Sequence, residues 1–367
     1  MRESSPMIGI GKMDEQKGRP DPHKEKKMKM LITGGAGFIG SNFIHFLLGP
    51  NSHLREDSQV LNLDKLTYAG NLENLADLVH HPQYRFVQGD ICDGQLVDRL
   101  LADGVDAVIN FAAESHVDRS LYEPDIFIQT NVVGTQVLLH AALRHRIKRF
   151  IQVSTDEVYG SLTPEAPGFR EDTPLTPNSP YSASKAAADL LVRSYYQTYG
   201  FPAMITRCSN NYGPYQFPEK LIPLLVTNAM EDQHLPIYGD GLNVRDWIHV
   251  RDHCRALQLI LENGKEGNIY NIGGEGERTN LEIAEAILRI LGKSKSLIRF
   301  VPDRPGHDRR YAINASKINR ELGWNPSYPL ETGLEQTVRW YMDHRDWWQK
   351  VKSGAYRDFY QKHYRDR

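Results

Sequence analysis

Short apolar runs, each bounded by Gly or Asp, alternate with amphipathic stretches of helical length from residue 30 onward. This rhythm is typical of βαβ units, whose right-handed crossovers build a parallel sheet. The predicted strands are Met30–Thr33, Gln59–Leu63, Arg85–Gln88, Ala107–Phe111, Arg149–Ser154 and Ala203–Arg207. The helices between them include Ile39–Leu48, Leu96–Ala102 and Val132–Arg144. The pattern therefore predicts an α/β fold with a doubly wound parallel sheet.

The alternation breaks after about Tyr212, where glycines and prolines interrupt the chain. Two later amphipathic stretches, Asn280–Leu291 and Leu330–His344, have helical spacing with no strand between them. A smaller, mostly helical second unit is expected here. The alternative that strands near 246–250 and 269–272 return to the first sheet stays open.

The first residues read as a tail, because 1–29 is rich in charge, contains two prolines and has no apolar core like that of a signal peptide. The predicted organisation is a disordered tail at 1–29, a first unit at 30–211 and a second unit at 212–367.

Composition narrows the functional classes. Lys and Arg total 44 against 46 Asp and Glu, so the net charge of -2 gives no reason to expect a nucleic-acid partner. No run approaches the roughly 18 apolar residues of a membrane span. Three widely spaced cysteines, Cys92, Cys208 and Cys254, are too few for a disulfide framework. A soluble, cytoplasmic protein is expected.

A glycine-rich turn lies between the first strand and the first helix, where Gly35, Gly37 and Gly40 satisfy G-x-G-x-x-G. Such glycines allow a tight turn and close approach of a pyrophosphate to the helix N-terminus. The second strand runs into Asp64, whose carboxylate can accept from an adenosine ribose 2′-OH and would repel a 2′-phosphate. A Rossmann-like site for NAD rather than NADP is predicted.

Two further strand ends lie at the same carboxyl edge, where open α/β sheets bind ligands. The segment at 89–91 follows the third strand and is expected to hold the adenine. The segment at 112–116 follows the fourth and is expected to line the ribose and nicotinamide. An Asp after a strand is also a common helix cap, so each signal alone is modest.

The sequence Asn178-Ser179-Pro180 is a helix-start signal, and it places Tyr181 and Lys185 one turn apart on one helix face. A nearby ammonium stabilises a phenolate, so this pair predicts a tyrosine base. In isolation the same spacing is more often a solvated helix face. Thr155, at the end of another strand, is expected to share a hydrogen bond with the substrate oxygen.

Two adjacent carboxylates, Asp156 and Glu157, follow that strand. Hydride transfer alone needs no paired acid and base, whereas elimination of water needs one group to remove a proton and another to protonate the leaving hydroxyl. The alternative is that both are solvated loop carboxylates without a catalytic role.

With these motifs together, the chain resembles the extended short-chain dehydrogenase/reductases, and within them the dehydratases that act on dTDP-glucose. The resemblance spans nearly all of 28–367. Its motifs are TGGAGFIG at 33–40, LDKLTYAGN at 63–71, AAESHVDRS at 112–120, STDEVYG at 154–160, YSASKA at 181–186, SNNYGPYQFPEKLIP at 209–223 and DRPGHDRRYAI at 303–313. Epimerases of the superfamily typically lack the Asp-Glu pair.

The resemblance implies an NAD-dependent lyase of deoxysugar biosynthesis, a cytoplasmic homodimer that converts dTDP-glucose to dTDP-4-keto-6-deoxyglucose. Tyr181, aided by Thr155 and Lys185, would take the proton of the 4-OH during oxidation at C4. Glu157 would then remove the C5 proton, and Asp156 would protonate the departing 6-OH before hydride returns to C6. A UDP-glucose dehydratase, an epimerase, or a dinucleotide-sensing regulatory protein remain alternatives.

Binding residues are carried over from the same resemblance. The cofactor residues would be Gly34, Gly37, Phe38, Ile39, Gly40, Asp64, Lys65, Leu66, Thr67, Asp90, Ile91, Ala112, Ala113, Ser115, Thr130, Tyr181, Lys185 and Asn211. The substrate residues would be Ser115, Thr155, Asn210, Lys220, Leu221, Pro236, Ile237, Tyr238, Arg245, Asn280, Asp303, Arg304, Pro305, Gly306 and His307. His249 and His253 are interpreted as structural, and no metal is expected.

Overall fold

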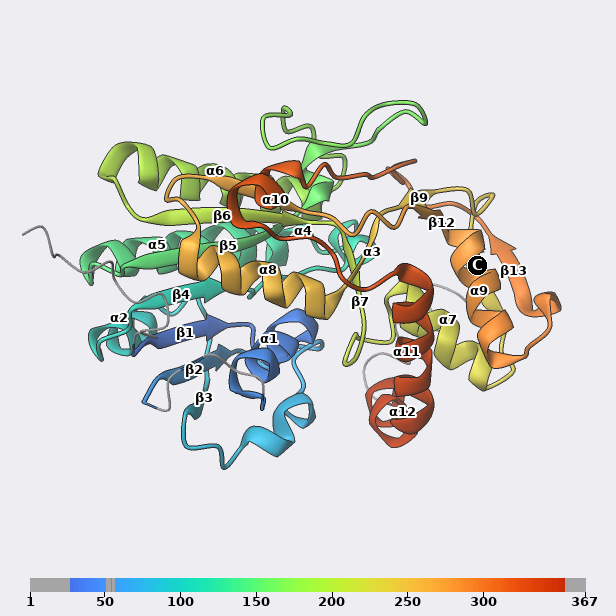
Figure 1. The fold of residues 1–367 in the computed structure, drawn as a ribbon, viewed down its shortest axis with the longest axis horizontal. Helices are drawn as coiled ribbons and strands as arrows, with labels where there is room; N and C mark the ends of the chain where they lie inside the picture. The colour runs from blue at the N-terminus through green and yellow to red at the C-terminus, as the bar shows by residue number, and fades with distance from the viewer. Residues whose placement is uncertain (1–26, 51–53, 55–56, 354–367) are drawn as a thin grey trace, which may run out of the picture.

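The computed structural model describes residues 27–50, 54 and 57–353, so most of the predicted tail lies outside the described residues. Seven parallel strands form one sheet in the order β11-β6-β5-β4-β1-β2-β3 (Figure 1). They are β1 (Lys29–Thr33), β2 (Gln59–Asp64), β3 (Tyr84–Gln88), β4 (Ala107–Asn110), β5 (Arg149–Thr155), β6 (Ala203–Cys208) and β11 (Ile269–Ile272). The predicted doubly wound fold is confirmed, and the six strands expected from the sequence are all present with slightly shifted ends.

Both faces of the sheet are covered by helices, because successive strand residues point to opposite sides. Met30 and Ile32 of β1 pack with α1 (Phe38–Leu48) and α8 (Val250–Asn263). Leu31 between them packs into the opposite cluster. That second face carries α2 (Gly94–Ala102), α5 (Thr135–Arg144) and α6 (Pro180–Tyr199).

The helix expected at Val132–Arg144 belongs to a longer helical stretch. The stretch runs through α4 (Pro124–Phe127), the π-helical turn η2 (Ile128–Gly134) and α5. By length and composition, Pro124–Arg144 is the one helix among the described residues that could cross a membrane, although the sequence suggested none. Leu138 and Leu139 are fully buried against the sheet, so one face of the stretch packs on the core.

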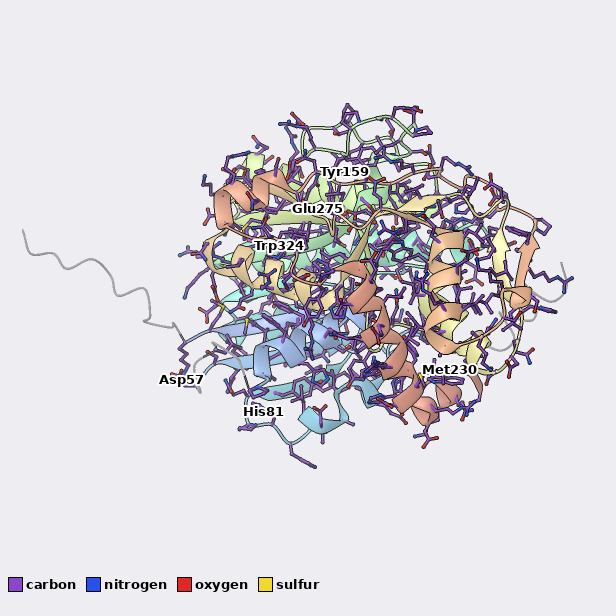
Figure 2. All side chains as sticks on the ribbon, turned by 45° about the vertical axis from the view of Figure 1, so that its right-hand side comes forward. Asp57, His81, Tyr159, Met230, Glu275 and Trp324 are labelled. Atoms are coloured by element: carbon purple, nitrogen blue, oxygen red, sulfur yellow. The ribbon has the colours of Figure 1, made fainter. Side chains whose placement is uncertain are left out.

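The smaller unit gathers at one end of the sheet (Figure 1) and has its own apolar cluster. Its main elements are α7 (Leu221–Met230), β8 (Leu235–Tyr238), α9 (Asn280–Leu291), β13 (Ile298–Val301), α11 (Leu330–Asp343) and α12 (Arg345–Ser353). Among the side chains labelled in Figure 2, Trp324 belongs to the sheet cluster, and Met230 packs against the cluster of the smaller unit.

The chain returns from the second half to the sheet twice. The segment near 269–272 forms the edge strand β11 beside β6, and α8 covers the β1 face. The segment near 246–250 instead forms β10 (Trp247–His249), which pairs with β7 (Asn210–Tyr212) outside the large sheet. The remaining elements are η1 (Leu72–Leu78), α3 (Val117–Ser120), η3 (Asp156–Tyr159), β9 (Val244–Arg245), β12 (Arg278–Thr279), η4 (Lys295–Leu297) and α10 (Ser316–Leu322).

Candidate active site

Two adjoining cavities lie over the carboxyl ends of the strands. The larger, of about 290 Å³, is lined by the loops that follow β1 to β5. It spans the point between β1 and β4 where the strand order reverses, which is where open α/β sheets bind dinucleotides. The smaller, of about 160 Å³, opens toward the second unit. Both cavities share Glu157, Asn210, Glu219 and Lys220 as lining residues.

The glycine turn brings backbone close to backbone. Gly34 has φ +69°, and a Cβ there would meet the backbone nitrogen of Ala112 at 2.6 Å. A Cβ on Gly40 would meet the Gly34 carbonyl at 2.4 Å. Gly37 caps α1 without a side-chain hydrogen bond, and the first turn of the helix lines the larger cavity. Free N–H groups at a helix start are suited to a pyrophosphate.

Asp64 is held at the end of β2 by two backbone donors, Ala36 N–H at 2.9 Å and Leu66 N–H at 2.8 Å. Each carboxylate oxygen keeps a lone pair that could accept from a ribose hydroxyl. Lys65 forms an ion pair with Asp90 at 2.8 Å on the neighbouring strand end. The glycine turn, the open helix start and this carboxylate fit NAD.

The start of α6 presents Tyr181 and Lys185 to the cavity. Ser179 and Ser182 form a reciprocal capping box with Pro180 in the first turn. Tyr181 and Lys185 are both buried and line the larger cavity, while the Lys185 ammonium donates to the Val153 carbonyl at 2.7 Å.

The electrostatics of Tyr181 differ from the expectation. Burial, and then the nearby Glu157 carboxylate, raise the Tyr181 pKa well above its ordinary value, and a hydrogen bond with Thr155 only partly opposes this. Burial also lowers the pKa of Lys185. Without further positive charge, the phenol therefore stays protonated at neutral pH.

Asp156 and Glu157 lie in the short helix η3, with Thr155 as its N-cap. Asp156 is 1 % exposed, so the alternative of a solvated loop carboxylate does not describe it. Burial raises its pKa well above the ordinary value, and the carboxylates of Glu157 and Asp246 raise it further. Burial and these neighbours therefore favour the protonated form of Asp156.

Glu157 has a different surrounding. Burial raises its pKa too, but Arg304, Arg245 and Lys220 oppose that shift. The pKa of both carboxyls is raised, but cations oppose the rise more at Glu157 than at Asp156, and such a difference suits two groups to act as acid and base in one site. Asp156 is placed to donate a proton, and Glu157 is the one that cations help to ionise.

Comparison with known proteins gives a consistent picture. Residues 31–337 match the family model described as GDP-mannose 4,6 dehydratase. A dTDP-glucose 4,6-dehydratase of Streptomyces niveus is 54% identical over 89% of this chain and 96% of its own length. The crystal structure of DesIV, a dTDP-glucose 4,6-dehydratase from Streptomyces venezuelae with NAD bound, is 52% identical and covers 89% of this chain and 100% of that chain, with a TM-score of 0.86.

This chain belongs to the dTDP-glucose 4,6-dehydratase family. A UDP-glucose 4-epimerase of Thermotoga maritima also shares the fold, with a TM-score of 0.79, 29% identity and coverage of 86% of this chain and 99% of that chain. The fold alone therefore does not separate dehydratases from epimerases. The carboxyl pair after Thr155 is the feature that bears on the distinction.

Most binding residues expected from the sequence line the cavities of this dehydratase-family chain. The expected cofactor residues all line the larger cavity except Leu66, whose φ of +57° turns its N–H toward Asp64. The expected substrate residues that line neither cavity are Ile237, Asp303, Pro305 and Gly306. Ile237 is buried in the cluster of the smaller unit, and Asp303 accepts from the Arg304 backbone and contacts His307.

His116, expected with the rest of 112–116 to line the ribose and nicotinamide, lines the smaller cavity instead, because α3 begins directly after it. Other polar lining residues of the smaller cavity, Asp118, Glu219 and Tyr311, were not singled out from the sequence. His116, Asp118 and Glu219 lie within the motifs at 112–120 and 209–223, but their spacing gave no sign that they meet. His249 caps α8 and stacks on Tyr328, while the His253 ring contacts Asn211 at 2.9 Å.

Proposed function

We propose that this protein converts dTDP-glucose to dTDP-4-keto-6-deoxyglucose with NAD as a recycled cofactor, a step in deoxysugar biosynthesis. The observation that carries the proposal is the carboxyl pair Asp156 and Glu157, which lines the same cavity as Tyr181 and in which more cations oppose the raised pKa of Glu157 than that of Asp156. Net dehydration without net oxidation needs this pair in addition to the oxidising residues.

NAD, when bound along the glycine turn and Asp64, supplies a hydride acceptor for C4 of the sugar and a hydride donor for C6. The chain supplies the proton transfers. Tyr181 takes the proton of the 4-OH, and Thr155 hydrogen-bonds the same oxygen. The neighbouring Lys185 ammonium and a cationic nicotinamide favour the phenolate that burial alone opposes.

Elimination then uses the two carboxyls in turn. A ketone at C4 acidifies the C5 hydrogen, which Glu157 removes as a base. Asp156, whose protonated form burial favours, gives its proton to the departing 6-OH. Burial thus favours the form of Asp156 that this step needs. After hydride returns to C6, the protonated Glu157 gives its proton back to C5, and the proton taken from the 4-OH by Tyr181 replaces the one lost by Asp156 through exchange with solvent.

The smaller cavity is proposed to hold the nucleotide diphosphate. Arg245, Arg304 and Lys220 line it; Arg245 is buried, and the other two are partly buried. Guanidinium groups match phosphate oxygens with two parallel hydrogen bonds. The sugar would then extend toward Glu157 at the junction of the cavities.

The test is conversion of dTDP-glucose deuterated at C4, with no reductant added. The label is expected at C6 of a 4-keto-6-deoxy product. Product without deuterium at C6, or no such product, would refute the proposed cycle. A parallel reaction with UDP-glucose distinguishes a dTDP-glucose dehydratase from a UDP-glucose dehydratase.

A cytoplasmic homodimer is the further part of the proposal. The three cysteines are all free, as a reducing compartment requires. Apolar side chains are exposed on neighbouring helices, at Ile126, Ile128 and Val133 of the α4–η2 stretch and at Leu190 of α6. Such a patch favours a helix-to-helix contact between two copies. Leu190→Lys should lower the sedimentation coefficient to that of a monomer, whereas an unchanged dimer would exclude α6 from the contact.

A further inference from the structure

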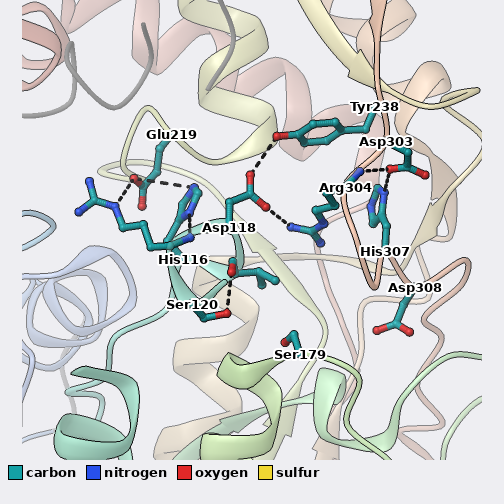
Figure 3. A network of polar contacts seen from close by, with 12 residues as sticks. His116, Asp118, Ser120, Ser179, Glu219, Tyr238, Asp303, Arg304, His307 and Asp308 are labelled. Atoms are coloured by element: carbon teal, nitrogen blue, oxygen red, sulfur yellow. Dashed lines mark hydrogen bonds and ion pairs between the residues drawn. The ribbon is translucent and has the colours of Figure 1, made fainter. Parts of the chain in front are cut away.

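Asp118 connects the two halves of the molecule. It lies in α3, the short helix that follows β4, and its side chain is almost completely buried. One carboxylate oxygen accepts from Arg304 Nη1 at 2.8 Å, and the other accepts from the Tyr238 hydroxyl at 2.9 Å (Figure 3). Both donors belong to the second half of the chain, and both line the smaller cavity.

The segment that carries Asp118 is itself firmly held. His116 caps α3 by accepting from the Arg119 backbone N–H, and the Ser120 hydroxyl donates to the Val117 carbonyl at 2.6 Å. The Lys220 ammonium donates to the Ser115 carbonyl at 2.8 Å just before the helix. Figure 3 shows the Glu219 carboxylate facing His116, 3.8 Å from its Nε2. These contacts hold Asp118 in place, so its carboxylate can fix the positions of the Arg304 and Tyr238 side chains.

Arg304 still has unused donor capacity. Its Nε–H is buried and has no hydrogen-bond partner within the part of the chain that the structure describes. A buried donor without a partner is costly, and an anionic oxygen in the adjoining cavity would satisfy it. The ion pair with Asp118 uses Nη1 and holds the guanidinium fork in one orientation, which removes part of the ordering cost of binding.

We infer that Asp118 is a positioning residue for the nucleotide diphosphate: it holds Arg304 and Tyr238 in the geometry that receives the ligand. The inference rests on the proposed function, because that function supplies the diphosphate ligand. The segment after β4 then has two roles: it lines the cofactor cavity, and through α3 it positions residues of the smaller cavity.

A purely electrostatic view predicts the opposite effect. A carboxylate near the diphosphate repels it, so removing the charge of Asp118 would tighten binding. Positioning should dominate, because Arg304 without its partner is free to turn toward other anions such as Glu157, which already interacts with it. The direction of the change in dTDP affinity therefore decides between the two views.

The experiment uses the NAD-loaded enzyme, titrated calorimetrically with dTDP and, separately, with thymidine. Asp118→Asn keeps the side-chain shape but loses the charge, and we expect the Kd for dTDP to rise about 10-fold, the equivalent of one charge-assisted hydrogen bond. Thymidine, which lacks the diphosphate, should bind as it does to the wild type. The KM for dTDP-glucose should rise with the dTDP Kd, while kcat changes much less.

Asp252→Asn is the matched control. Asp252 is also a buried carboxylate with several donors, among them Ser327 N–H at 2.8 Å and Tyr328 N–H at 2.9 Å, but it lines neither cavity. Its loss should lower thermal stability without changing either Kd. A rise in the dTDP Kd of this control equal to that of Asp118→Asn would overturn the inference, because it would trace the effect to general destabilisation.

A double-mutant cycle tests whether Asp118 acts through Arg304. In an Arg304→Met background, Asp118→Asn should weaken dTDP binding little further. Additive effects of the two substitutions on the dTDP Kd would overturn the inference. So would an unchanged or lower dTDP Kd in Asp118→Asn, or an equal loss of affinity for thymidine. If the Asp118 variant does not fold, Tyr238→Phe, which removes only one hydroxyl that Asp118 accepts from, is titrated with dTDP and thymidine in its place. No dTDP binding by the wild type would instead refute the proposed function.

Discussion

Asp156→Asn is expected to stop the reaction after oxidation of the sugar. The substitution keeps the shape and the neutral charge of the buried, protonated acid, but the amide cannot give up a proton. Loss of a general acid costs about 10²–10⁴-fold in rate, equivalent to roughly 3–5 kcal/mol of transition-state stabilisation. Product formation should fall by that factor while oxidation at C4 continues.

A measurement of folding stability distinguishes loss of the general acid from damage to the fold. The folded-state pKa of Asp156 is raised above its unfolded value, so the group stabilises the fold at low pH and that contribution is lost as the pH rises above about 3.9 toward the folded pKa. Asn does not ionise and avoids this loss. The variant should therefore be at least as stable as the wild type at pH 7, as urea unfolding would measure.

The assay follows a single turnover of dTDP-glucose in D2O, with NADH absorbance and deuterium incorporation at C5 as readouts. Asp156→Asn should accumulate NADH and still exchange the C5 hydrogen, because Glu157 remains. Glu157→Gln should accumulate NADH without C5 exchange. Wild-type product formation by Asp156→Asn, or loss of C5 exchange in that variant alone, would refute the assignment of acid and base.

Three other outcomes follow from the geometry. Gly34→Ala should lower the unfolding free energy by several kcal/mol and abolish NAD retention. Gly104→Ala, with φ +78° and nothing within 4 Å of the added Cβ, should lower it by only about 1–2 kcal/mol, and equal losses in the two variants would contradict this. Asp64→Asn should weaken NAD binding about 10-fold and reduce discrimination against NADP, and unchanged Kd values for both dinucleotides would count against a ribose contact. Burial lowers the pKa of His253 to about 3, so the unfolded state binds an extra proton below about pH 6.5 and stability falls with acidification. The unfolding free energy from urea titrations between pH 7 and 5 should fall less steeply in His253→Gln, by about 1.4 kcal/mol per pH unit at most, and parallel slopes would contradict the assignment.

The strand positions could be predicted because parallel strands buried on both faces leave continuous apolar runs, as at Met30–Thr33. The glycine turn and the helix start before Tyr181 could be predicted for a similar reason, since the residues that form them are adjacent in the chain. The π-helical turn at 128–134 could not, because Asn131 in it hydrogen-bonds Glu114 and Ser184, which are distant in sequence.

The sequence by itself determined the fold class, the dinucleotide turn, the tyrosine and lysine on one helix face, and the presence of two adjacent carboxyls. Local spacing and side-chain chemistry are enough for these features. Tertiary structure decided how the pKa values of Asp156 and Glu157 are shifted, because burial and the cations of Arg304, Arg245 and Lys220 come from separate segments. It also decided that Asp118 meets Arg304 across 186 positions of the chain, since only packing brings such distant residues within hydrogen-bond distance.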